Sequence, residues 1–265
     1  MRRPLLLLCT LLALAACGSP RRADVASPRN VPALTVTSSN FSDHKPVDWD
    51  GRPPTAYAVH GVDISRYQQW IDWPTARANG VNFAFIKATE GGDMVDPMFQ
   101  THWRGAAEAG VLPGAYHFYY HCRPAIEQAR WFIRHVPRVK GALPPVLDME
   151  WTPFSPTCPQ RPDPAEVRRN AAIFMNALTE HYGQVPILYT TPDFYEANEM
   201  WRVSGQEFWL RSTARHPQDR YADQHWTFWQ YTGTGDVPGI VGKVDVNVFA
   251  GNPAAWRDWA GRRLQ

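Results

Sequence analysis

The sequence predicts one α/β domain over residues 57–265, a modified (β/α) barrel. Short apolar runs alternate with longer amphipathic stretches from His60 onward, which is the pattern of repeated βα units. The apolar runs number eight, and eight strands can close a TIM-like barrel. About five of the runs alternate with helices, and the last three follow one another with few helices between them. Repeated βα units also predict a parallel sheet.

The first half of this domain is divided by residues that end helices. Asn79-Gly80 ends the first helix and Gly110 ends the second, because glycine readily takes the left-handed conformation found there. The predicted elements are a strand at 59–64, a helix at 73–78, a strand at 81–88, a helix at 97–109, a strand at 112–118, a helix at 125–136 and a strand at 146–150.

The second half opens with the clearest predicted helix. Asp163 is a suitable N-cap, with Pro164 at the first helical position and Glu166 at the third. Its apolar stripe consists of Val167, Ala171, Phe174 and Leu178, and Gly183 ends the helix. A strand at 185–190, a short helical piece at 193–200 and strands at 208–212, 227–231 and 244–249 complete the barrel.

Residues 1–16 have the pattern of an export signal. Arg2 and Arg3 precede an apolar run that is too short to span a bilayer. Cys17 follows where the run stops, as in a bacterial lipobox, so we expect a lipoprotein signal peptide and a lipid on Cys17 that holds the protein on a membrane. An ordinary signal peptide with a chance cysteine is the alternative. Residues 17–56, which are rich in proline, are then a tether between the lipid and the barrel.

The expected location follows from the residue after the cysteine. Gly18 rather than Asp stands there. The resemblance to lipoproteins then implies the outer membrane, facing the periplasm, in a bacterium with two membranes, and the outer face of the cell membrane otherwise.

Cleavage of the signal also changes the charge balance and the cysteine count. Losing residues 1–16 leaves 25 basic against 25 acidic side chains, and such a neutral domain does not favour nucleic acid as a partner. Cys122 and Cys158 remain, and two spare cysteines in an exported protein suggest a disulfide, with free thiols as the alternative. They give no metal-site spacing. We expect a monomer with no cofactor.

Acidic side chains fall at the predicted strand ends. They are Asp63, Glu90, Asp148, Glu150 and Asp245, and His117 ends the third strand. Aspartate and glutamate are unfavourable in strands, so each needs a reason to be there. In a barrel of this type, chemistry takes place at the C-terminal strand ends. We therefore predict a pocket lined by these residues.

Asp148 and Glu150 are the sharpest pair among these acids. Residues i and i+2 of a strand share a face, so both side chains are expected to point into the barrel mouth. Their backbones lie about 6.5–7 Å apart at the strand rise. Two carboxyl groups about 5–9 Å apart are what glycoside hydrolysis requires. A structural ion pair with Arg or Lys is the alternative for each acid.

Several runs, in their order along the chain, resemble the family 25 glycoside hydrolases, the N-acetylmuramidase-type lysozymes. The matching runs are Gly61-Val62-Asp63-Ile64-Ser65-Arg66-Tyr67-Gln68, Phe85-Ile86-Lys87-Ala88-Thr89-Glu90-Gly91, Val95-Asp96-Pro97, Gly114-Ala115-Tyr116-His117-Phe118, Leu147-Asp148-Met149-Glu150, Trp229-Gln230-Tyr231 and Val244-Asp245-Val246-Asn247. The resemblance covers roughly residues 58–250, and its specificity lies in the ordered set.

This resemblance implies a muramidase that cleaves the β-1,4 bond after N-acetylmuramic acid in a peptidoglycan glycan strand. Glu150 matches the general acid, and Asp148 matches a second carboxylate that either attacks the sugar or orients its N-acetyl group. Asp63 and Asp245 match acids of the same pocket, and Tyr116 matches a tyrosine at its floor. One departure is Arg211, where the family commonly has a smaller residue.

Aromatic and polar residues near the strand ends complete the predicted site. Trp151, Trp229, Tyr116 and Tyr189 are placed to stack on sugar faces, with Gln230 beside Trp229, although an aromatic core would explain them as well. His117 is expected to be a hydrogen-bonded pocket residue. His117 and His121 would stand about 13 Å apart on one strand, too far to share a metal ion.

Two other functions fit parts of this pattern. The first is a metal-dependent polysaccharide deacetylase that would use Asp63, Asp148 and the histidines. The second is a non-catalytic lipoprotein that binds peptidoglycan on the same barrel.

Overall fold

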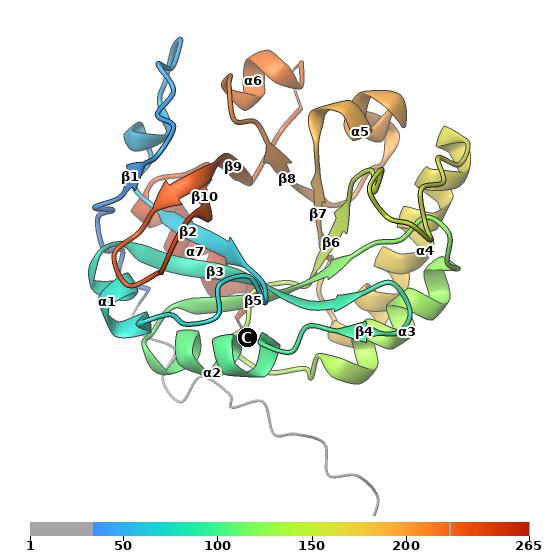
Figure 1. Ribbon diagram of the computed structural model, residues 1–265, viewed down its shortest axis with the longest axis horizontal. Helices are drawn as coiled ribbons and strands as arrows, with labels where there is room; N and C mark the ends of the chain where they lie inside the picture. Colours follow the sequence, from blue (N-terminus) through green and yellow to red (C-terminus); the bar gives the residue numbers. More distant parts are fainter. Residues whose placement is uncertain (1–33, 223, 265) are drawn as a thin grey trace, which may run out of the picture.

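A closed barrel of eight strands forms the body of the protein (Figure 1). The computed structural model describes residues 34–222 and 224–264, so the expected signal peptide and Cys17 lie outside the described residues. The barrel strands are β2 (His60–Ile64), β3 (Val81–Glu90), β5 (Leu112–Phe118), β6 (Val146–Met149), β7 (Ile187–Thr190), β8 (Glu207–Arg211), β9 (Phe228–Asp236) and β10 (Val244–Phe249). The predicted fold class is confirmed.

The seven barrel strands from β2 to β9 pair in parallel, as the repeated βα units predict, whereas β10 does not. This strand runs antiparallel to both of its neighbours, β9 and β2. Only residues 237–243 connect β9 to β10, and a parallel crossover needs about a dozen residues or more. The chain therefore turns straight back, and β10 begins at the end of the barrel where the parallel strands finish.

Helices cover the outside of the barrel (Figure 1), and those between β7 and β9 are short, as predicted. They are α1 (Trp73–Ala78), α2 (Phe99–Glu108), α3 (Ala125–His135), α4 (Pro164–Tyr182), α5 (Pro192–Ala197), α6 (Pro217–Arg220) and α7 (Pro253–Arg263), with 3-10 turns η1 (Pro54–Ala56) and η2 (Met200–Arg202). Asp163 caps α4 through the Ala165 N–H, and Gly183 ends it with a φ of 71°.

Two layers of apolar packing hold the barrel together. The α4 stripe of Val167, Ala171, Phe174 and Leu178 is buried between helices and strands. The barrel interior is aromatic, and α7 covers the end where the parallel strands begin. There Trp256 contacts Phe83 near the start of β3 and Phe228 at the start of β9. The opposite end of the barrel stays open.

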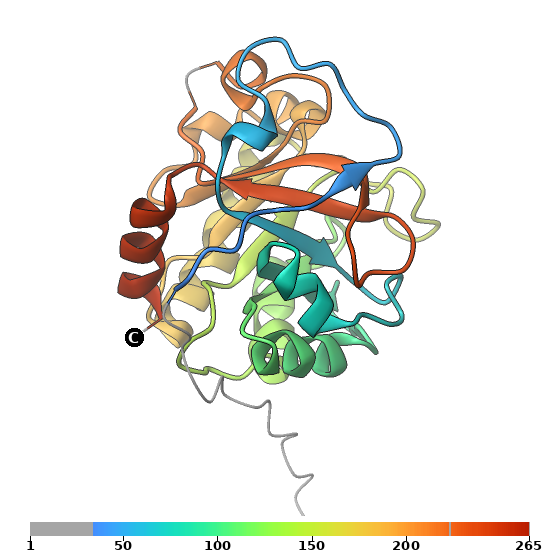
Figure 2. The same ribbon diagram turned by 90° about the vertical axis from the view of Figure 1, so that its left-hand side faces the viewer.

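The described part of the expected tether packs on the barrel, and Phe41 and Trp49 both contact its core. The short strand β1 (Ser42–Asp43) pairs with β9, and Figure 2 shows this segment running beside β9 and β10. Trp49 packs edge-on against Trp229, with ring centroids 5.1 Å apart. Apolar residues between the prolines hold the segment down, so residues 34–56 belong to the folded unit.

Cys122 and Cys158 form a disulfide, as predicted. It joins the loop after β5 to the loop after β6, beside the open end of the barrel. The short strand β4 (Met94–Val95) pairs with the end of β3 at the same rim. Within the described residues, every helix is too short or too polar to cross a membrane.

Candidate active site

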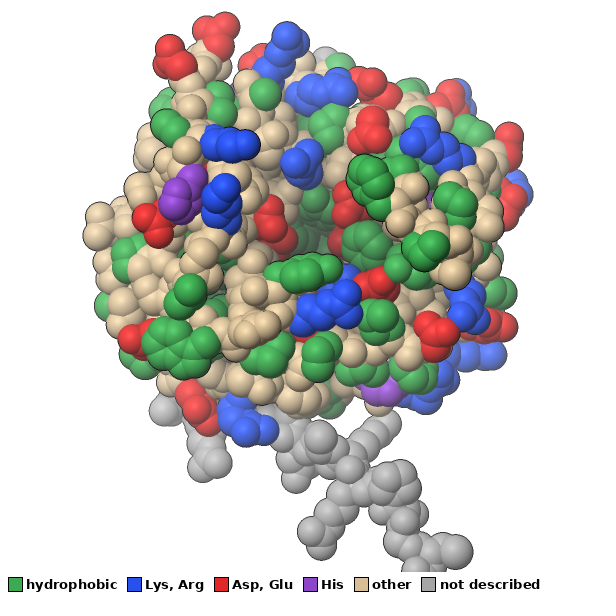
Figure 3. Space-filling view, in the orientation of Figure 1, with side chains coloured by type: hydrophobic (Ala, Val, Ile, Leu, Met, Phe, Trp, Pro, Cys, Tyr) green, Lys and Arg blue, Asp and Glu red, His purple; other side chains and the backbone are tan. Residues whose placement is uncertain are grey.

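A cavity of about 1560 Å³ opens at the C-terminal ends of the parallel strands. Figure 3 shows it as a hollow with acidic side chains on its walls. Strand ends supply the acids Asp63, Glu90 and Asp148, and Glu150 directly follows β6. Asp245 joins them because β10 begins at this end, where Asp245 stands directly opposite Asp63 in the strand register. All five predicted acids therefore line one cavity.

Asp148 and Glu150 both line this cavity, as the strand alternation predicts. Leu147 and Met149, which alternate with them, are fully buried in the layer between strands and helices. Asp148 is 7% exposed, and its buried Oδ1 has no hydrogen-bond partner within the described residues. Neither acid forms an ion pair with any residue of 34–222 or 224–264. The structural ion-pair interpretation is therefore not supported for this pair.

The environment of these two acids favours their neutral forms. Burial raises the pKa of Glu150 to about 7, with the negative charges of Asp193 and Asp245 adding to the rise and Arg211 opposing it. Burial and the neighbouring Glu150 raise the pKa of Asp148 well above its usual range. Because the two carboxyls repel one another when both are ionised, the ionised form of one favours the neutral form of the other.

Asp63 is held in place by two side-chain amides at the cavity floor. Its Oδ2 accepts hydrogen bonds from Gln230 Nε2 at 2.9 Å and from Asn247 Nδ2 at 2.8 Å. Tyr189 donates its hydroxyl to Gln230 Oε1 at 3.0 Å, and Trp209 donates its indole N–H to Asn247 Oδ1 at 2.7 Å. Each amide is thus fixed at both ends, which orients the Asp63 carboxyl.

The two facing aspartates carry raised pKa values. Burial and the charge of Asp245 raise the pKa of Asp63 well above its usual range, although its two amide donors oppose this. Burial raises the pKa of Asp245 to about 6, against the opposing charge of Arg211. Like charges directly opposite on neighbouring strands are unfavourable, which is consistent with an arrangement kept for chemistry.

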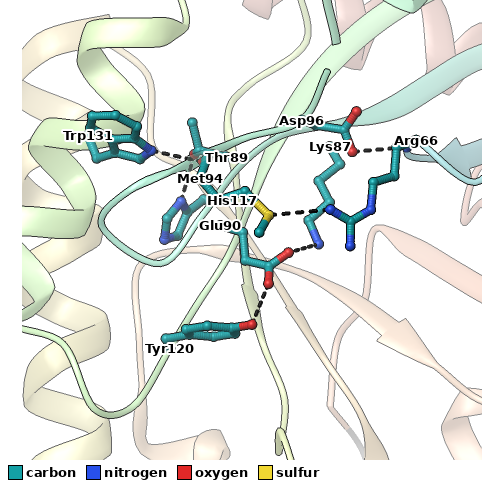
Figure 4. A network of polar contacts seen from close by, with 9 residues as sticks. All are labelled: Arg66, Lys87, Thr89, Glu90, Met94, Asp96, His117, Tyr120 and Trp131. Atoms are coloured by element: carbon teal, nitrogen blue, oxygen red, sulfur yellow. Dashed lines mark hydrogen bonds and ion pairs between the residues drawn. The ribbon is translucent and has the colours of Figure 1, made fainter. Parts of the chain in front are cut away.

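Glu90 lies in a different environment, drawn in Figure 4. Its carboxylate pairs with Lys87 at 2.5 Å and accepts a hydrogen bond from the Tyr120 hydroxyl. Burial alone would raise the pKa of Glu90, but Lys87 and Tyr120 outweigh it and hold the pKa below its usual value. Lys87 and Glu90, three residues apart, would face opposite sides of a regular strand. An irregularity in the pairing of β3 with β5 between Lys87 and Thr89 brings them together.

Three predicted aromatic residues reach the cavity. Tyr116 and Tyr189 are nearly buried and lie at its floor. Trp151 is partly exposed on the wall and packs on Phe194, with ring centroids 4.7 Å apart. The guanidinium of Arg161 lies 4.8 Å from the centroid of its ring. A flat aromatic side chain at this position can stack on a sugar.

His117 and Trp229 do not line the cavity, so these two predictions are wrong. His117 is fully buried outside the barrel, where it stacks on Phe174 with centroids 4.9 Å apart. Trp229 also faces outward and donates its indole N–H to the Ser212 carbonyl at 2.7 Å. The physical reason is strand alternation: Tyr116 and Gln230 point inward, so the residue next to each must point outward.

The histidines do not form the ligand set that a deacetylase would need. Nδ1 of His117 hydrogen-bonds with Thr89 Oγ1 at 2.7 Å, and Nε2 does so with Gln128 Oε1 at 3.1 Å. Nε2 of His121 hydrogen-bonds with the Glu150 carbonyl. Across residues 34–222 and 224–264, no three His, Cys, Asp or Glu side chains are grouped as metal ligands would be.

Sequence reasoning assigned no pocket role to Lys87, Asn247 and Trp209. Alternation gives a signal for Asn247, because it shares a face of its strand with Asp245. Trp209 shares a face with Arg211 in the same way. No sequence signal reveals Lys87 as a partner of Glu90, since the strand irregularity that joins them is a property of the folded sheet.

The chain is similar in sequence and in fold to known glycosyl hydrolases. Residues 62–240 match the family described as Glycosyl hydrolases family 25. The chain is 36% identical to the uncharacterized protein YegX of Escherichia coli strain K12, over 80% of this chain and 77% of that protein. It is 32% identical to Lysozyme M1 of Streptomyces globisporus, over 76% of this chain and 71% of that enzyme. A family 25 glycosyl hydrolase structure from Bacillus anthracis matches with a TM-score of 0.70 and 35% identity, covering 83% of this chain and 98% of that one.

Proposed function

The chain belongs to glycosyl hydrolase family 25, and on this premise we propose that it is a muramidase. The reaction is hydrolysis of the β-1,4 bond between N-acetylmuramic acid and N-acetylglucosamine in peptidoglycan. The observation that carries the proposal is the pair Asp148 and Glu150, two carboxyls on the wall of one cavity at the barrel mouth that have no ion-pair partner among the described residues. Glycoside hydrolysis uses such a pair, one carboxyl protonated and the other ionised.

Glu150 acts as the general acid in this proposal. A proton donor to the leaving oxygen must be protonated before the bond breaks, and its pKa should lie close to the working pH. A pKa of about 7 meets both requirements at neutral pH, whereas an ordinary glutamate would be almost fully ionised. Activity should therefore be high below about pH 7 and decline as the pH rises through that value.

Asp148 supplies the negative charge. When Glu150 holds the proton, Asp148 is the ionised partner, and no donor from residues 34–222 or 224–264 reaches its Oδ1. The carboxylate either attacks the anomeric carbon or orients the N-acetyl group of the substrate to do so. The two routes are separated by a glycan whose N-acetyl groups have been removed, because only the second route requires the acetyl oxygen.

The test compares wild type, Glu150→Gln and Asp148→Asn on purified peptidoglycan by the release of new reducing ends. Wild type should release N-acetylmuramic acid at the reducing ends, and Glu150→Gln should be slower by about 10²–10⁴-fold. Equal release by Glu150→Gln would sink the assignment of the acid. If the wild type instead released products with N-acetylglucosamine at their reducing ends, the proposed position of the cleaved bond would be wrong.

We propose further that the mature protein is a lipoprotein held by Cys17. The support is the sequence pattern alone, an apolar run that stops at Cys17 after two arginines. Two or three acyl chains on one cysteine would suffice for stable anchoring. Cys17→Ser should move the protein from the membrane fraction to the soluble fraction. Retention of Cys17→Ser on the membrane would count against the anchor.

A further inference from the structure

Arg211 differs from the other basic side chains around the cavity. Lys87 is paired with Glu90, and Arg123 is paired with Asp93 at 2.6 Å. Arg161 lies over the Trp151 ring, and Arg66 contacts the Tyr67 ring and the Met94 sulfur. The side chain of Arg211 makes no hydrogen bond, ion pair or aromatic-ring contact with any residue in the described part of the chain. Its guanidinium donors are available to a ligand.

The position of Arg211 is at a junction between two cavities. It ends β8 and lines the main cavity that holds Asp148 and Glu150. It also lines a second cavity of about 360 Å³, whose wall includes Ser212, Thr213 and Arg215. In Figure 3, basic side chains gather beside the hollow over β8 and α6. Arg211 therefore lies on the walls of both the acidic main cavity and the basic side cavity.

Among the described residues, three arginines and no acidic residue line the side cavity. Arg220 on its wall is ion-paired with Glu196. Arg215 is exposed, and its side chain, like that of Arg211, has no partner within residues 34–222 and 224–264. Two guanidinium groups on one small cavity, both without a partner in the described part of the chain, complement a carboxylate, which arginine binds with two parallel hydrogen bonds.

Arg211 also acts on the acids of the main cavity without binding them. Its charge opposes the rise in pKa of both Glu150 and Asp245. It forms no ion pair with either carboxylate, so its hydrogen-bonding capacity remains unused. A ligand carboxylate bound here would lie near the reacting bond.

Peptidoglycan carries its negative charge at a definite place. The sugar rings are uncharged, and the lactyl group of N-acetylmuramic acid holds either a free carboxylate or an amide-linked stem peptide with carboxylates of its own. A stem peptide extends away from the sugar, and the side cavity shares Arg211 with the main cavity that holds Asp148 and Glu150.

We propose that Arg211 and Arg215 form an anion subsite that binds a carboxylate of the stem peptide, so that this protein selects glycan strands that carry peptides. The inference rests on the proposed muramidase function and names the part of the substrate that the side cavity recognises. Arg211 is a specificity-determining residue in this account, and Arg215 extends the subsite toward solvent.

The test measures binding by calorimetry in the Glu150→Gln variant, which prevents turnover. Four glycan oligomers of equal length are compared, with a lactyl group that is free, coupled to an uncharged amine, coupled to L-Ala-D-Glu, or coupled to the same dipeptide with its carboxyls amidated. The acidic dipeptide should bind about 10–100-fold more tightly than its amidated form.

Substitutions in the same background assign the preference to residues. Adding Arg211→Ala should bring the affinity ratio of acidic to amidated dipeptide close to one, and Arg211→Lys should keep part of it. Arg215→Ala should lower the ratio by up to about fivefold, since Arg215 is exposed. Arg123→Ala removes an arginine of the same cavity that is already paired, and it should leave the ratio unchanged.

The outcomes separate the subsite from the proposed function. An unchanged ratio in Arg211→Ala would overturn the subsite. A loss confined to the oligomer with the free lactyl carboxylate would overturn the stem-peptide assignment, because the anion would then be the lactyl group. Hydrolysis of the same oligomers by the wild type tests the muramidase proposal separately, and its absence would leave the binding result intact.

Discussion

Three carboxyl groups on the walls of one cavity fall into two opposite environments. Glu90 is held by Lys87 and Tyr120, and its pKa lies below the usual value. Asp148 and Glu150 have no ion-pair partner within the described residues, and both pKa values are raised. Burial raises the pKa of all three acids, and only Glu90 has a cation and a hydroxyl donor that outweigh this effect. A cation within hydrogen-bonding distance makes one acid structural, and its absence makes the other two available for proton chemistry.

The largest expected effect comes from removing an acid on the unpaired side. Asp148→Asn should lower kcat by about 10²–10³-fold, because the group that stabilises the developing positive charge is lost. Glu90→Gln should lower kcat by about tenfold or less, since the charge of Glu90 is already neutralised by Lys87. Reducing-end release from peptidoglycan measures both. A greater loss from Glu90→Gln than from Asp148→Asn would break the comparison.

A second effect concerns the pH dependence of stability, to which Glu150 and Glu90 should contribute with opposite signs. The pKa of Glu150 is raised to about 7 in the folded state, so the folded protein loses stability as the pH rises from the ordinary carboxyl range through 7. Glu150→Gln should therefore raise Tm at pH 8 by a few degrees and have little effect near pH 4.

The pKa of Glu90 is lowered, so its contribution to stability is present above the ordinary carboxyl range and is lost as the pH falls. Glu90→Gln should accordingly lower Tm at pH 8. Thermal unfolding followed by circular dichroism at the two pH values checks both signs. The same sign for both variants at pH 8 would contradict the account.

The smallest expected effect comes from Lys87, whose charge acts on Glu90 and on the pair Asp148 and Glu150. Lys87 lowers the pKa of Asp148 and of Glu150, as well as that of Glu90. Lys87→Met should raise the pKa of Glu150 and move the alkaline limit of kcat to higher pH, while Lys87→Arg should keep it in place. Lys87→Met leaves Glu90 without its cation, so the double variant Lys87→Met with Glu90→Gln is the control. Its alkaline limit of kcat should also move to higher pH. A shift of the alkaline limit of kcat to lower pH in Lys87→Met would contradict the effect of Lys87 on Glu150.

Most of the fold could be predicted from the sequence because local signals agree with it. The strand at 112–118 and the helix at 73–78 have the predicted bounds, and the Asp163 cap and Gly183 stop define α4. The antiparallel direction of β10 follows from the short connection at residues 237–243. The hydrophobic periodicity of a strand carries no information about its direction in the sheet. The packing of residues 34–56 rests on contacts with distant strands, such as that of Ser42 with Asp236.

The candidate site was predictable to the extent that strand alternation is regular. Asp63, Asp148, Glu150 and Asp245 line the cavity as expected, and Asp245 does so because its strand is reversed. Applied strictly, alternation would have excluded His117 once Tyr116 was placed inward, and Trp229 once Gln230 was. The pairing of Lys87 with Glu90 depends on an irregularity in β3 that the residue pattern does not encode.

The central claim is that Glu150 is an unpaired acid whose buried surroundings keep it protonated near neutral pH. A ¹³C NMR titration of glutamate side-chain carboxyls tests this directly, with the Glu150 resonance assigned by its loss in Glu150→Gln. The account predicts a midpoint of about 7 for Glu150. A midpoint near the ordinary glutamate value of about 4.3 would contradict it.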